Sequence, residues 1–169
     1  MNNKLRLILG ALLVLLIVGA YFGWRWFHSD ERQVRKQMAG ICEDVSKRPG
    51  EGNAAAALKL LSLGNRLAPH VEVGVHDVPI RGGFSGDELT AHVSRARYSL
   101  DDLSVDIVDQ LVTIRDNEAL VDCVIHGRAS SSQYQYRMDD DFHLQITLRK
   151  DEDGKWRFVS FLEGSFLER

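Results

Sequence analysis

The chain has 169 residues and a formal net charge of −3, and 44% of its residues are hydrophobic. Beyond residue 24 it carries 19 basic and 24 acidic side chains, so it lacks the excess of Lys and Arg that binding to a phosphate backbone requires. This balance excludes nucleic acid as a partner. The two cysteines, Cys42 and Cys123, are far apart and lack the paired spacing of a zinc site.

The first predicted element is an apolar run at residues 7–24, which no charged side chain interrupts between Arg6 and Arg25. At about 1.5 Å per residue, a helix of this length spans roughly 27 Å, close to the hydrocarbon thickness of a bilayer. Aromatic residues, which gather at membrane boundaries, continue the run to Phe27. The sequence therefore predicts a short tail at residues 1–6, a transmembrane anchor at 7–27 and one domain at 28–169.

The anchor has an alternative interpretation. The small residues Val18, Gly19 and Ala20 also suit signal-peptidase cleavage, so the run could be a secretory signal that is removed. Basic residues flank it on both sides, with more after it than before, but long C-terminal domains translocate regardless of flanking charge. We therefore expect a single-pass membrane protein with a short internal tail and an extracytoplasmic domain, which would be periplasmic in a bacterium.

Three helices are predicted after the anchor. The first begins at Asp30, which is expected to cap it together with Gln33, and ends before Pro49. Its apolar residues at helical spacing predict an amphipathic helix that packs on a sheet, and the alternative is a helix that lies on the membrane surface. The third runs from Gly86 to about Tyr98 and is capped by Ser85. The buried sides are expected to hold, in the first helix, Val34, Met38, Ile41 and Val45; in the second, at residues 54–67, Ala55, Leu58, Leu61 and Leu67; and in the third, Leu89, Val93 and Ala96 or Arg97.

Strands are predicted before and after the third helix. Val71, Val73 and Val75 alternate with polar or small residues, which indicates a half-buried strand. From Leu103 onward, alternating segments joined by turns at residues 115–118 and 151–154 and by a polar hairpin end at 130–141 indicate an antiparallel meander. The predicted fold class is α+β, with three helices packed on one face of a curved, mainly antiparallel sheet.

This order of elements resembles the nuclear transport factor 2-like fold, also called SnoaL-like or the cystatin-like cone. The resemblance covers roughly residues 30–163 and is carried by HVEVGVHDVP, GGFSGDELTAHVSRAR, LSVDIVD, NEALVDCVIHG and FHLQITLRKDEDGKWRFVSFLEG. It implies a cone that in some members houses an isomerase, cyclase or dehydratase with an Asp or His base, and in others serves transport, assembly or dimerisation. Membrane-anchored members resemble assembly proteins of type IV secretion, but their Asn-Pro-x-Gly motif is absent here.

Candidate acid and base residues lie at the end of the first strand and on the third helix. Asp77, His92 and Tyr98 could form a pocket site if the fold brings them together, because burial can tune a carboxylate or an imidazole toward neutral pH. The alternative is that Asp77 belongs to a turn and that His92 is a solvated helix residue. No nucleophile elbow, phosphate-binding loop or Cys-x-x-Cys motif is present, and nothing in the sequence implies a cofactor.

Two further pairs of residues are candidates for a metal site and for a disulfide. His126 and His143 would face each other if the hairpin is centred near Tyr134 and Gln135, but two histidines make an incomplete metal site, and the wet face of a sheet explains them equally well. Cys42 and Cys123 could form a disulfide in an oxidising compartment or remain two buried thiols.

The sequence favours a membrane-tethered, non-catalytic module that binds a small apolar ligand or assembles as a homodimer or within a membrane protein complex. The alternative is a small-molecule isomerase or dehydratase that uses a pocket Asp or His.

Overall fold

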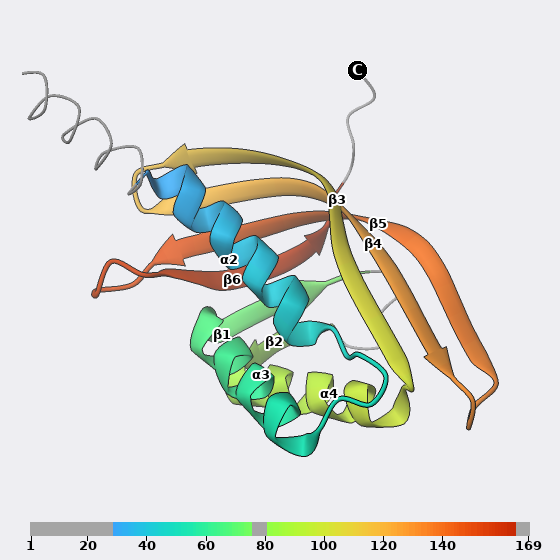
Figure 1. Ribbon diagram of the computed structural model, residues 1–169. Coiled ribbons are helices and arrows are strands. Elements are labelled where there is room, and N and C mark those ends of the chain that lie inside the picture. Colours follow the sequence, from blue (N-terminus) through green and yellow to red (C-terminus); the bar gives the residue numbers. More distant parts are fainter. Residues whose placement is uncertain (1–28, 76–80, 165–169) are drawn as a thin grey trace, which may run out of the picture.

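The computed structural model describes residues 29–75 and 81–164, which form an α+β domain with three helices on the concave face of one curved sheet (Figure 1). The helices are α2 (Asp30–Val45), α3 (Asn53–Arg66) and α4 (Gly86–Ser99). The strands are β1 (Leu67–Gly74), β2 (Gly82–Ser85), β3 (Asp102–Arg115), β4 (Glu118–Ser131), β5 (Tyr136–Lys150) and β6 (Trp156–Glu163). The predicted fold class is confirmed.

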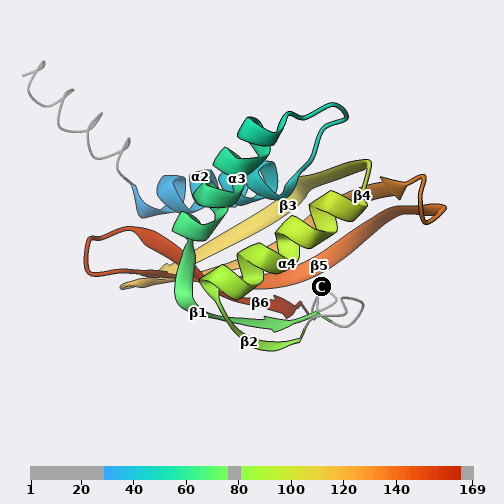
Figure 2. The same ribbon diagram turned by 90° about the horizontal axis from the view of Figure 1, so that it is seen from below.

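The six strands form one sheet in the order β2-β1-β6-β5-β4-β3. Every neighbouring pair is antiparallel except β1 and β6, which run parallel. The long strands β3, β4 and β5 bend strongly, so that their ends wrap around the helices (Figures 1 and 2). A bulge between Ile107 and Asp109 of β3 accompanies this bend, as expected where a long strand changes direction.

The predicted anchor at residues 7–27 lies outside the described residues, and it therefore stays a prediction. Within residues 29–75 and 81–164, none of the helices is long and apolar enough to cross a bilayer.

The core lies between the helices and the concave face of the sheet. In β4, Ala119, Val121, Cys123 and Ile125 are buried and alternate with less buried residues, as the sequence predicts. In α2, Val34 and Met38 are completely buried in this core. Helix α2 is thus a core helix, and the alternative of a helix lying on the membrane surface is wrong.

The predicted cap of α2 is wrong in detail. The N-cap residue is Ser29, whose side chain makes no capping hydrogen bond, and Asp30 is the first residue of the helix. The Asp30 carboxylate instead lies 2.6 Å from Nζ of Lys150, and this ammonium is 5.1 Å from the centre of the Trp156 ring. The carboxylate therefore pairs α2 with the end of β5, which offers a full charge in place of a backbone amide.

The predicted buried side of α3 is also wrong. Ala55 is exposed, and Leu58 and Leu61 are 68% and 65% exposed, whereas Leu63 is 2% exposed. Leu67 is buried, but it begins β1 instead of ending the helix. Apolar residues occur all around this helix, so periodicity alone did not determine its face.

Contacts at the end of α3 fix its orientation. Arg66 crosses α2, where its Nε donates to Asp44 at 2.7 Å and its Nη1 donates to Gln37 at 2.5 Å. The guanidinium passes directly over Gly40, where a Cβ would lie 2.3 Å from Cζ of Arg66, so a side chain at this position would displace the guanidinium. These contacts turn Leu63 toward the core and leave Leu58 and Leu61 outside.

A buried arginine joins the three helices. Arg97 of α4 is 4% exposed, and its Nη1 lies 2.9, 2.9 and 2.6 Å from the backbone oxygens of Asp44, Val45 and Ser46. Its Nη2 pairs with Glu51, whose other carboxylate oxygen accepts a hydrogen bond from Lys59 of α3 at 2.7 Å. The guanidinium thus binds the free carbonyl groups at the end of α2, where the helix dipole is negative.

A lysine makes the reciprocal contact. Lys47, directly after α2, donates from its Nζ to the backbone oxygens of Arg97, at 2.8 Å, and Leu100, at the end of α4. Arg97 of α4 therefore caps the C-terminus of α2, and Lys47, just after α2, caps the C-terminus of α4. We call this set (Lys47, Glu51, Lys59 and Arg97 with the end of α2) the polar clamp.

Replacing Arg97 with alanine should destabilise the domain by about 3–5 kcal/mol, because Glu51 would remain buried without its cation and the end of α2 without its donors. The matched control is Arg95→Ala on the same helix, whose side chain is exposed and which should change stability by less than about 0.5 kcal/mol. Urea denaturation of the full chain measures both values. Equal effects of the two substitutions would contradict the structural role of the clamp.

The stability of the domain should depend on Glu51 in acid. Burial acts to raise the pKa of this carboxyl group, but the hydrogen bond from Lys59 and the charges of Arg97 and Lys59 outweigh burial and hold its pKa below the ordinary 4.5. Its contribution to stability is therefore complete above pH 4.5 and lost as the pH falls through the lowered pKa of the folded state.

Glu51→Gln should accordingly be less stable at pH 7 but lose less stability than the native chain between pH 4.5 and lower pH. The control is Glu118→Gln, which removes an exposed carboxylate paired with Arg149 and should leave the acid profile unchanged. Urea denaturation midpoints of the native chain and both variants, measured from pH 7 to below pH 4.5, test this expectation. A profile of Glu51→Gln parallel to that of the native chain would overturn the assignment.

Candidate functional site

The candidate site is an apolar cavity of about 180 Å³ between the helices and the concave face of the sheet. Its walls come from α2, α3 and α4 and from five strands, and every described lining side chain is apolar or a thiol. The lining residues are Ile41, Cys42, Val45, Leu63, Leu67, Val73, Leu89, Val93, Val105, Ile125, Ile146 and Phe161. An engineered cavity of roughly 150 Å³ with a similar aliphatic and aromatic lining accepts benzene, so this one has room for a small apolar group.

Among the described residues of this lining, Cys42 alone has a titratable side chain. Burial, together with the charge of Asp106, raises its pKa to about 11. Burial also raises the pKa of Cys123, to about 12, with contributions from Cys42 and Asp122. Both cysteines are buried as free thiols in the same hydrophobic core. A disulfide between them stays a prediction.

The predicted acid and base residues do not meet in the cavity. Tyr98, at the end of α4, is 92% exposed. His92 packs its ring edge-on against Phe84 with 5.6 Å between the ring centres, and neither His92 nor Tyr98 lines the cavity. Asp77 lies outside the described residues. The described candidates therefore provide no acid or base for chemistry inside the cavity.

The predicted facing of His126 and His143 is wrong. The hairpin is centred one residue earlier than expected, so His126 lies opposite Asp141 and His143 lies opposite Val124. Nδ1 of His126 is 2.8 Å from Asp141, and its Nε2 is 3.2 Å from Asp139. Within the described part of the chain, no group of three or more His, Cys, Asp or Glu side chains is arranged to hold a metal ion.

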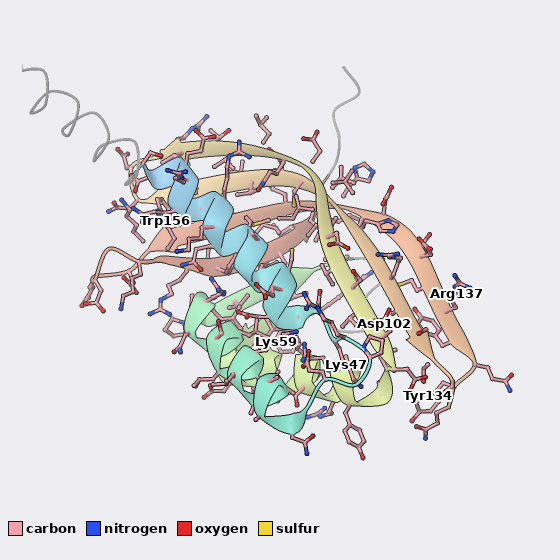
Figure 3. All side chains as sticks on the ribbon, viewed as in Figure 1. Lys47, Lys59, Asp102, Tyr134, Arg137 and Trp156 are labelled. Atoms are coloured by element: carbon pink, nitrogen blue, oxygen red, sulfur yellow. The ribbon has the colours of Figure 1, made fainter. Side chains whose placement is uncertain are left out.

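A second hollow, here called the α2–β3 groove, lies on the surface where α2 and the loop after it face β3. It has a volume of about 660 Å³, and it includes Lys47, Lys59 and Asp102, which come from three different segments (Figure 3). Its other lining residues are Ala39, Cys42, Glu43, Ser46, Arg48, Leu103, Ser104, Val105, Asp106, Ile107 and Arg128. Cys42 and Val105 line both this groove and the apolar cavity.

The residues that line the two hollows were not predicted as site residues. The predicted site residues were acids, bases and metal ligands, whereas the side chains that line the cavity are typical of an ordinary hydrophobic core. The available signal was the predicted inner face of the third helix, since Leu89 and Val93 were placed there and both line the cavity.

Comparison with known proteins defines the fold. No protein-family profile matches the chain, and no curated protein matches its sequence. Among solved structures, the protein Kfla4162 from Kribbella flavida is similar with a TM-score of 0.66 and 9% identity, over 83% of this chain and 93% of that one.

Two structures from Novosphingobium aromaticivorans are also similar. One is called an NTF2-like protein with a cystatin-like fold, with a TM-score of 0.58 and 15% identity over 95% of this chain and 90% of that one. The other is provisionally called a scytalone dehydratase, with a TM-score of 0.59 and 15% identity over 79% of this chain and 81% of that one. At these identities the likeness establishes the nuclear transport factor 2-like fold and nothing finer.

The two thiols should be inert in the native protein. With a pKa of about 11 in place of 9.0, Cys42 has about a hundredfold less thiolate at pH 8, and burial restricts access further. Iodoacetamide should therefore modify neither cysteine until the protein is denatured, as measured by intact mass. Native modification of Cys42 at the rate of an ordinary thiol would contradict the buried position.

The same labelling tests the predicted disulfide. If both cysteines react after denaturation without a reductant, no bridge exists between Cys42 and Cys123. If they react only after reduction, the bridge has formed. The reduced and denatured protein is the control, since both cysteines must react there.

Proposed function

We propose that this protein is a non-catalytic binding module that holds a small, largely apolar ligand in the cavity of its cone. The observation that supports this function is the composition of the cavity wall, in which the described residues contribute no carboxylate, imidazole, hydroxyl or amide side chain. A cavity of this kind binds by excluding apolar surface from water.

The isomerase or dehydratase alternative has weaker support. Such chemistry needs a positioned acid or base within hydrogen-bonding reach of the reacting group. Among the described lining residues, Cys42 alone can transfer a proton, and its raised pKa of about 11 keeps it protonated and a poor base at neutral pH. The dehydratase name of one similar structure describes that protein, at an identity that leaves the site residues of this chain undetermined.

The proposal includes the tether and the setting predicted from the sequence. An anchor at residues 7–27 would hold the binding domain at a membrane on the extracytoplasmic side, where a sparingly soluble ligand partitions. Assembly as a homodimer or within a membrane protein complex belongs to the same proposal. Light scattering after size exclusion of the full chain in detergent determines the number of copies.

Toluene should bind the native chain with a Kd of about 1 mM or lower, because it fills an existing apolar space. NMR titration of methyl resonances measures the affinity and identifies the site. Val93→Phe places a ring in the cavity and should abolish binding, while Leu61→Phe, on the exposed face of α3, is the matched control and should bind normally. The native chain failing to bind toluene, or Val93→Phe binding it fully, would refute the proposed function.

A further inference from the structure

The apolar cavity and the α2–β3 groove share two lining side chains, which we call the wall between them. Cys42 from α2 and Val105 from β3 line both hollows. Cys42 is 7% exposed and Val105 is half-buried, so each side chain has one side toward the cavity and another toward the surface. A modest movement of either side chain would join the two spaces.

Hydrogen bonds join the end of α2 to β3 next to this wall. The Ser46 hydroxyl accepts a hydrogen bond from the amide of Val105 at 3.0 Å. Lys47 and Leu103 exchange two backbone hydrogen bonds of 2.7 and 3.1 Å. These bonds hold the end of α2 against the start of β3, and Cys42 lies one helical turn before Ser46. The wall therefore lies beside a hydrogen-bonded junction between α2 and β3.

The groove is polar but carries no strong excess of either charge. Four cations (Lys47, Arg48, Lys59 and Arg128) and three carboxylates (Glu43, Asp102 and Asp106) line it. Lys47 and Lys59 already donate to backbone oxygens of the polar clamp, and Arg128 lies 4.0 Å from Asp106. Donors and acceptors thus occur side by side, which suits an uncharged head group that both donates and accepts hydrogen bonds.

We propose that the ligand is a small amphipathic molecule, with an apolar part of about six to eight carbon atoms in the cavity and an uncharged hydrogen-bonding head in the α2–β3 groove. The molecule passes between Cys42 and Val105. This inference rests on the proposed function, since it requires that the cavity binds a ligand. It adds that the head of the ligand faces water and that the ligand enters the cavity between Cys42 and Val105.

Toluene and benzyl alcohol test the inference, because they share a ring and differ by a hydroxyl group. In a closed apolar cavity the hydroxyl would be buried without a partner, which should weaken binding of benzyl alcohol by about tenfold or more relative to toluene. With the hydroxyl in the groove, we expect the two affinities to agree within about threefold. In NMR spectra, the hydroxymethyl protons should show contacts to the methyl groups of Val105, and the ring protons to those of Val93.

A pair of variants locates the opening. Val105→Ala thins the wall and should improve the affinity for benzyl alcohol relative to toluene by about threefold or more. Val93→Ala is the matched control, since Val93 lines the cavity but not the groove, and it should change both affinities alike. If both variants shift the ratio equally, the opening is not at Val105.

The outcomes separate the two proposals. If toluene binds and benzyl alcohol binds tenfold more weakly, the cavity is closed toward the groove, so this inference fails and the proposed function stands. If neither compound binds the native chain, both fail. Comparable affinities together with hydroxymethyl contacts at Val105 support both, and comparable affinities with those contacts elsewhere overturn the assignment of the groove.

Discussion

The arrangement of this domain depends on the pairing of Arg97 with Glu51 beneath the end of α2. Three carbonyl groups at that end lie against one guanidinium, which satisfies backbone acceptors that a buried helix terminus would otherwise leave free. Because Arg97 belongs to α4 and Glu51 also accepts from Lys59 of α3, one buried ion pair sets the positions of all three helices. The opposite walls of the cavity, with Cys42 on α2 and Val93 on α4, are spaced by it.

The clamp also separates charge from the apolar interior. Burying an ion pair is costly unless further hydrogen bonds satisfy it, and here the carbonyl groups and Lys59 supply them. The polar side chains of the clamp gather at the ends of α2 and α4, and no charged side chain of the described residues lines the cavity. The groove begins where this polar region meets β3, so a polar surface and an apolar cavity share the lining residues Cys42 and Val105.

The sequence predicted the strands well and the site poorly. Strict alternation in β4 identified its buried face because a strand has only two faces. Helix α3 carries leucines on several sides, so tertiary contacts, chiefly those of Arg66, decided its orientation. The register of the β4–β5 hairpin depends on a turn with Gln135 at a positive φ of 48°, and a shift of the hairpin centre by one residue places Asp141, two residues before His143, opposite His126. Arg97 was one of two candidates for an inner position, but the partners of a buried arginine come from segments far apart in the chain.

The size of the cavity is itself an argument for binding. Apolar side chains that line a space of about 180 Å³ lack packing partners on that side, and lost contacts of this kind reduce stability. Several lining residues are valines, including Val73, Val93 and Val105, and larger side chains at these positions would fill part of the space. A ligand in the cavity would restore the lost contacts, and the same residues that leave the fold underpacked would then be those that recognise it.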